Sequence, residues 1–162
     1  MTPRMVWLRI LGLLLLGLLL ALIELPEALA ALRPAFPLLA IAAVAFATRS
    51  GWILPVAWLY GICLDTVFAA PLGQHAMVLT LLCFAVTKLS GLMRVLALWQ
   101  SGLLMLPVWA LAGFLLFWMD GTAQHAASTA LRWLPILSTA LCWPLVEWLA
   151  RRRLRALAAA HR

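Results

Sequence analysis

Six apolar runs fill most of this 162-residue chain, and any fold must accommodate them. They are residues 10–23, 36–47, 52–64, 76–87, 103–119 and 133–149. A helix that crosses the roughly 30 Å of bilayer hydrocarbon needs about 20 residues. The first, fifth and sixth runs approach that length, whereas the three middle runs are shorter. The middle runs are therefore either short helices in a locally thinned bilayer or partly buried, re-entrant segments.

The composition agrees with a membrane environment. The chain is 67% hydrophobic and has a mean hydropathy of +1.08, with 12 basic and 5 acidic residues. A water-soluble domain carries about a quarter charged residues and a disordered chain needs low hydrophobicity, so both classes are excluded. Three cysteines without a CxxC motif argue against a disulfide framework and a zinc site. We therefore expect an all-α integral membrane protein, a bundle of about six transmembrane helices.

The basic residues alternate between the ends of the runs, and this alternation predicts an orientation. If the N-terminus is inside and all six runs cross the membrane, only two basic residues, Arg33 and Arg132, lie outside. The inner side then holds Arg4, Arg9, Arg49, Lys88, Arg94, Arg151, Arg152, Arg153, Arg155 and Arg162. An excess of Lys and Arg marks the cytoplasmic side, so the pattern favours crossing and places both termini in the cytoplasm. The predicted single domain has spans at about 8–25, 34–48, 51–68, 75–90, 101–119 and 132–150, and a basic cytoplasmic tail at 151–162.

The first run also resembles a secretory signal. Arg4 and Arg9 precede it, and the sequence 28–30 (Ala-Leu-Ala) is similar to a cleavage site. Glu24 and Glu27 lie between the apolar stretch and that site, and acidic residues at these positions disfavour cleavage. We therefore expect an uncleaved first helix.

A stripe of residues spaced four apart follows the third run and ends in an acid. Its members, which fall on one helix face, are Ile53, Ala57, Gly61 and Asp65. Ala57 and Gly61 form a small-xxx-small pair that lets a neighbouring helix approach closely, so we predict that a partner's transmembrane helix packs there. Asp65 either ties the helix end to a loop or a partner, or is a solvated acid at the end of a span.

Turn-forming residues lie beside this stripe. Pro71-Leu72-Gly73 follows Asp65, and its glycine suits a turn that needs a positive φ. Arg33-Pro34 precedes the second run, where proline fits a helix start. Because Arg33 and Asp65 are each the lone strong charge near a span end, we predict that they pair at the outer face. His75 is expected to be an ordinary surface residue.

Basic residues directly follow the last run. Four of them, Arg151, Arg152, Arg153 and Arg155, are expected to contact anionic lipid, at roughly 1 kcal/mol each, or a cytoplasmic partner. Glu147 stands four residues before Arg151, which is the spacing of an ordinary ion pair at a helix end. A nucleic-acid-binding surface needs a basic face on a soluble module, which this sequence lacks, so no nucleic-acid partner is expected.

Several motifs, each weak alone, occur in a recognisable order. They are Arg33-Pro34 before a short run, Gly61-x-x-x-Asp65 followed by Pro71-Leu72-Gly73, Leu98-Trp99-Gln100, Phe117-Trp118, and Trp143-Pro144 before a basic tail. Together they resemble the rod shape-determining protein MreD family over about residues 33–155. The chain departs from the family pattern at Ala35, where an acidic or amide residue commonly follows Arg-Pro. No polar contact of that side chain is therefore carried over.

The resemblance implies a non-enzymatic scaffold of the bacterial inner membrane without a cofactor. Proteins of that family act with MreC, which links cytoplasmic MreB filaments to periplasmic cell-wall synthesis, and RodA and the elongation-specific penicillin-binding protein belong to the same assembly. The family's six-helix arrangement is similar to the substrate-binding subunits of energy-coupling-factor transporters. A homo-oligomer is compatible with the sequence.

The competing function is a substrate-binding membrane subunit of a vitamin-type transporter. Such a subunit needs a cavity with a few convergent polar groups, for which the sequence offers Arg33, Asp65, His75 and Asp120. An intramembrane enzyme needs a paired acid–base constellation, and the sequence contains no recognisable one.

Overall fold

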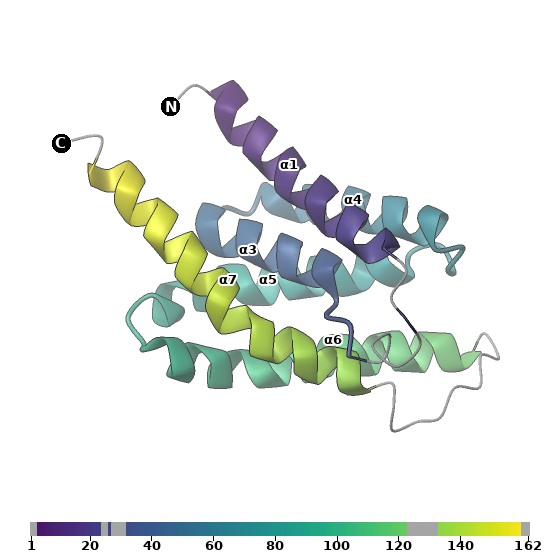
Figure 1. Cartoon of the computed structure of the whole chain (residues 1–162). Coiled ribbons are helices and arrows are strands. Elements are labelled where there is room, and N and C mark those ends of the chain that lie inside the picture. Colours follow the sequence, from purple (N-terminus) through teal and green to yellow (C-terminus); the bar gives the residue numbers. More distant parts are fainter. Residues whose placement is uncertain (1–2, 24–25, 27–31, 123–132, 160–162) are drawn as a thin grey trace.

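The computed structural model describes residues 3–23, 26, 32–122 and 133–159, and every regular element in these ranges is helical (Figure 1). The helices are α1 (Pro3–Leu22), α3 (Phe36–Thr48), α4 (Ile53–Val67), α5 (Gln74–Met93), α6 (Leu98–Thr122) and α7 (Leu134–Ala159). The prediction of an all-α chain with about six helices is confirmed for this part of the chain. α7 continues to Ala159, because the Arg-, Leu- and Ala-rich sequence of its last turns favours helix. The membrane spans stay a prediction.

Consecutive helices run in opposite directions along one bundle (Figure 1). The start of α1 and the last turns of α7 lie at one end, together with the C-terminal ends of α3 and α5. We call this the basic end, because it holds Arg49, Arg94 and Arg151. The opposite end, where α4 ends and α5 begins, is the Asp65 end.

Local sequence explains where two of the helices end or begin. α3 ends at Arg49, whose left-handed conformation (φ 53°) lets its N–H donate to the Ala45 oxygen at 3.0 Å. α5 begins after Gly73, whose φ of 96° strains any residue that carries a side chain. The predicted positive φ at Gly73 is thus confirmed.

The core is centred on α3, against which α1, α5 and α7 all pack. Nine of the 13 residues of α3 are buried. Three aromatic rings extend the core towards α6 and α7, since Phe46 and Trp109 each meet the Trp143 ring edge-on, at centroid distances of 6.3 and 5.7 Å. α4 packs mainly along α5, which forms the largest helix–helix interface described.

Large apolar side chains also cover much of the outer surface. Several leucines of α1 are exposed, among them Leu8, Leu11, Leu15, Leu16 and Leu19. α6 and α7 also expose large apolar side chains. α5 and the segment Leu98–Met119 of α6 are long and apolar enough to cross a membrane, whereas Val6–Leu22, α3 and α4 are shorter apolar helices. Contiguous apolar surface of this extent is typical of a protein that contacts lipid or other proteins.

Candidate functional site

The Asp65 carboxylate connects the end of α4 to the start of α5. Asp65 is 1% exposed. Its Oδ2 accepts a hydrogen bond from the Gly73 N–H at 2.8 Å, and its Oδ1 accepts one from the His75 N–H at 2.8 Å. Backbone N–H groups at a helix start lack partners within the helix and favour a negative charge. Of the two alternatives for Asp65, the structure therefore favours the acid that ties a helix end to a loop.

The imidazole of His75 completes this junction. Its Nδ1 lies 2.8 Å from Asp65 Oδ1, and the side chain is 18% exposed. His75 is therefore more than the ordinary surface residue expected from the sequence. Leu72, in the connecting turn, is 76% exposed, whereas the Asp65 carboxylate is buried.

The Ala57–Gly61 face of α4 is occupied by α5 of the same chain. Both residues are buried. A Cβ atom added to Gly61 would lie 2.2 Å from the Cα of Ala76 and 2.4 Å from its nitrogen. The predicted close approach of a helix therefore exists, but α5 makes it. This corrects the expectation that a partner's helix packs on this face, because neither residue remains open to a partner.

Arg33 does not pair with Asp65. Its Nη2 donates to the carbonyl oxygen of Leu20, in the last turn of α1, where a cation is favoured by the helix dipole. The carboxylate of Asp65 is used by Gly73 and His75 instead. The predicted ion pair is thus wrong, since each charge satisfies groups at the end of a different helix. Pro34 accepts the Phe36 N–H at 2.9 Å, just before the start of α3.

This arrangement predicts independent effects at Arg33 and Asp65. The losses of unfolding free energy caused by Arg33→Ala and Asp65→Ala should add within about 0.5 kcal/mol in the double variant. Asp65→Ala and His75→Ala should instead couple by about 0.5–3 kcal/mol, because their side chains touch. Unfolding by sodium dodecyl sulfate in mixed micelles would measure all five variants. Coupling between Arg33 and Asp65 equal to that between Asp65 and His75 would contradict the structure.

A buried carboxylate joins three helices at the basic end. Glu147 of α7 is 0% exposed and accepts from the Ser101 hydroxyl of α6 at 2.6 Å and from Arg151 Nε and Nη2 at 3.0 and 2.6 Å. Arg151 also donates from Nη1 to the Leu96 oxygen at 3.1 Å and from Nη2 to the Met93 oxygen. The expected ordinary ion pair is therefore a buried lock that fastens α7 to α6 and to the end of α5.

This lock changes what the basic tail can contact. The Arg151 side chain is only 14% exposed and is held by Glu147 and two carbonyl groups, which corrects its assignment as a lipid contact. Arg152 and Arg153 are exposed, and the Arg152 guanidinium lies 5.4 Å from the centre of the Trp148 ring. Contact with lipid or a cytoplasmic partner stays a prediction for these two residues and for Arg155, whose side chain lies outside the described residues.

Arg94 caps α3 at the same end. Its Nη2 donates to the Phe46 oxygen at 2.7 Å, and its guanidinium lies 5.1 Å from the centre of the Phe46 ring. Burial lowers the pKa of Arg94, and the nearby charges of Arg49 and Arg151 lower it further. Arginine nevertheless stays protonated in proteins. Three positive groups therefore lie close together at the basic end.

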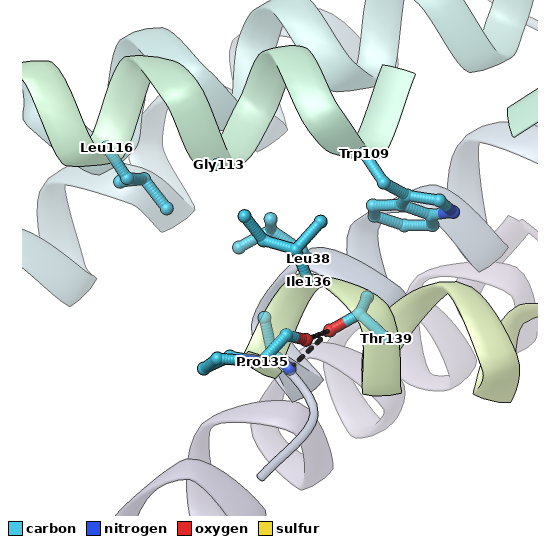
Figure 2. A pocket seen from close by; sticks show the side chains of 8 residues that line it. Leu38, Trp109, Gly113, Leu116, Pro135, Ile136 and Thr139 are labelled. Carbon is cyan, nitrogen blue, oxygen red and sulfur yellow. Dashed lines mark hydrogen bonds between the residues drawn. The ribbon is translucent and has the colours of Figure 1, made fainter. Parts of the chain in front are cut away.

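An apolar cavity of about 240 Å³ lies between α3, α6 and α7 (Figure 2). It is lined by Ala35, Leu38, Trp109, Gly113, Leu116, Pro135, Ile136 and Thr139. The Thr139 hydroxyl is already satisfied, because it accepts from the Ala35 N–H at 2.8 Å and donates to the Pro135 oxygen. The cavity therefore suits an apolar group better than a polar ligand.

A second cavity of about 310 Å³ forms an apolar groove between α6 and α7. Its lining is Leu106, Pro107, Ala110, Trp133, Ile136, Leu137 and Ala140. Neither cavity is lined by Arg33, Asp65 or His75, and the Asp120 side chain lies outside the described residues. The two cavities thus give no support to the transporter alternative.

The comparison with protein families gives one match that covers most of the chain. Residues 1–153 match the family described as rod shape-determining protein MreD. No curated protein and no solved structure matches the chain, so the expected likeness to transporter subunits finds no support. The matched range includes α1, which the motifs in the sequence did not cover. The chain therefore belongs to the rod shape-determining protein MreD family of membrane proteins.

Proposed function

We propose that the chain is a non-enzymatic scaffold subunit of the bacterial cell-elongation complex. It binds MreC within the inner membrane and helps to couple MreB filaments to peptidoglycan synthesis, with RodA and the elongation-specific penicillin-binding protein in the wider assembly. One observation carries this proposal beyond family membership. The charged side chains of Arg33, Asp65, Arg94, Glu147 and Arg151 all hold the chain's own helices together. Such use of charge suits a rigid platform for other proteins.

The proposed topology is multi-pass, with both termini in the cytoplasm. It is supported by the alternating helix directions (Figure 1) and by the position of Arg49, Arg94 and Arg151 at one end. Cytoplasmic loops carry an excess of Lys and Arg, so the basic end would face the cytoplasm. The Asp65 end would then face the periplasm, where the exposed Leu72 is available to partners.

The groove between α6 and α7 is the proposed binding site of the transmembrane helix of MreC. Because Ala57 and Gly61 are already buried within the chain, a partner must use an outward face. The groove is predominantly apolar and contains the small residues Ala110 and Ala140. Small residues allow two helices to approach closely in a membrane, where van der Waals packing drives association. This combination favours a transmembrane helix as the occupant.

Co-purification tests the scaffold and the groove together. Ala110→Leu should weaken MreC binding about tenfold, since overpacking a contact costs about 1–3 kcal/mol and about 1.4 kcal/mol corresponds to a factor of ten. The matched control is Gly12→Leu, which adds a side chain on the exposed face of α1 where no atom lies within 4 Å. Each tagged protein would be purified from native membranes in mild detergent, and co-purifying proteins would be quantified by mass spectrometry.

The outcomes separate the two parts of the proposal. Equal MreC recovery with wild type, Ala110→Leu and Gly12→Leu would exclude the groove as the MreC binding site. It would not contradict the scaffold function. Absence of MreC from the wild-type preparation, with paired ATPase subunits in its place, would contradict the scaffold itself.

A further inference from the structure

The basic end carries more positive charge than the protein itself neutralises. Arg49, Arg94 and Arg151 lie there, but Glu147 is the one acidic side chain that the described residues place beside them. Glu147 is fully engaged with Arg151 and Ser101. Arg49 and Arg94 are therefore left without a counter-charge within the described part of the protein.

Arg94 is anchored on one side only. Its Nη2 donates to the carbonyl oxygens of Phe46 and Ala47, at 2.7 and 3.5 Å. Its Nε is buried and has no hydrogen-bond partner. Nη1 makes no hydrogen bond with any described residue. The contacts to α3 thus fix the guanidinium in place without satisfying it. The buried Nε is closed to an external acceptor, whereas Nη1 is left as a donor for one.

Arg49 is held next to α5 by the backbone. Its left-handed conformation at the end of α3 turns the chain towards α4. Its Nη2 lies 3.3 Å from the position that a Cβ would take on Gly91 of α5. The absence of a side chain at Gly91 makes room for this guanidinium, which finds no acceptor among the residues that the structure describes. Lys88 is exposed one turn earlier on the same helix.

The surroundings of these arginines match the headgroup level of a membrane. Trp52 and Trp99 are exposed at the starts of α4 and α6, which adjoin the ends of α3 and α5. Exposed tryptophan is enriched at the boundary between hydrocarbon and water. Anionic headgroups lie at the same level, and basic pockets between transmembrane helices are suited to bind them.

We propose that Arg49 and Arg94 form a binding site for the phosphate group of an anionic phospholipid from the surrounding membrane. The guanidinium groups supply planar sets of donors that match phosphate oxygens. The bound lipid would bridge the ends of α3 and α5. This site differs from the general attraction of lipid to the tail, because it combines one side chain anchored on α3 with a second one that lies beside α5. It goes beyond the scaffold proposal and requires no partner protein.

Lipid titration of the purified full-length protein tests the site. In a zwitterionic detergent, added phosphatidylglycerol should raise the midpoint of thermal unfolding, followed by tryptophan fluorescence. Phosphatidylcholine and inorganic phosphate at equal concentrations should have little effect. Arg49→Asn should weaken phosphatidylglycerol binding about fivefold. Asparagine is chosen because it tolerates the left-handed conformation of residue 49.

Two further variants make the result specific. Arg153→Asn removes the same charge from the exposed tail, where attraction to anionic lipid is diffuse, and should weaken phosphatidylglycerol binding much less than Arg49→Asn does. Arg94→Lys keeps the charge but loses the planar donor group, so the rise in its unfolding midpoint caused by phosphatidylglycerol, measured from its own midpoint in detergent alone, should be smaller than in the wild type. Equal losses with Arg49→Asn and Arg153→Asn would show diffuse attraction and overturn the proposal. An equal shift with inorganic phosphate or phosphatidylcholine would also overturn it.

Discussion

Replacing Arg151 by leucine is expected to lower the free energy of unfolding by about 3–5 kcal/mol, because a buried carboxylate that loses its partner is strongly destabilising. Glu147 is 0% exposed, and Arg151 supplies its charge partner. The same substitution removes donors from the carbonyl groups of Met93 and Leu96. Both losses act on the contact between α7 and the end of α5. Unfolding by sodium dodecyl sulfate in mixed micelles would measure the change.

The neighbouring residue provides a matched control for this prediction. Arg152→Leu removes the same charge from an exposed position, where ion pairs and cation contacts contribute at most about 1 kcal/mol. The double variant Glu147→Leu/Arg151→Leu should regain much of the stability lost by Arg151→Leu, because no unpaired charge is left in the interior. If Arg151→Leu and Arg152→Leu lowered the free energy of unfolding equally, the buried ion pair of Glu147 and Arg151 would not form.

Gly61→Ala is expected to destabilise the protein by about 3 kcal/mol, at the upper end of the usual cost of overpacking. The added methyl group would meet backbone atoms of α5 at 2.2 and 2.4 Å, and backbone cannot move aside as a flexible side chain can. α4 and α5 must therefore separate along their shared interface. The free energy of unfolding in mixed micelles is again the measurement.

The same substitution elsewhere in a helix should behave in the opposite way. A Cβ at Gly12 would have no atom within 4 Å. Gly12→Ala should therefore be neutral or should stabilise α1 by up to about 1 kcal/mol through helix propensity. If both variants lost similar stability, the helix interface would not be as close as described.

The sequence predicted the helices well because the apolar runs are continuous and are separated by charges and turn residues. Gly73 could also be predicted, since a turn after proline needs a residue that tolerates positive φ. The four-residue stripe on α4 correctly indicated a close helix contact at Gly61. Spacing along one helix shows only that a face is shaped for a neighbour. It could not indicate that α5, rather than a partner, fills that face.

The polar contacts were harder to predict, because they depend on which helix ends meet in space. Arg33 and Asp65 looked like natural partners as isolated charges, yet each binds backbone groups of another helix. Glu147 and Arg151 have the spacing of a common surface pair. Their burial depends on segments far away in sequence, such as α6, whose Ser101 lies 46 residues from Glu147. A ten-residue separation across a proline–glycine turn was the one available sign that Asp65 and His75 meet.

The shortness of α3 has a consequence for biosynthesis. Its 13 residues rise about 20 Å, whereas the apolar layer of a bilayer is about 30 Å thick. The helix is therefore a poor candidate for insertion by itself as the chain emerges from the ribosome. Of the helices that surround it, α1 is made before it, but α5 and α7 are made after it. The centre of the fold is thus translated early and can be enclosed only when the last helix has been synthesised.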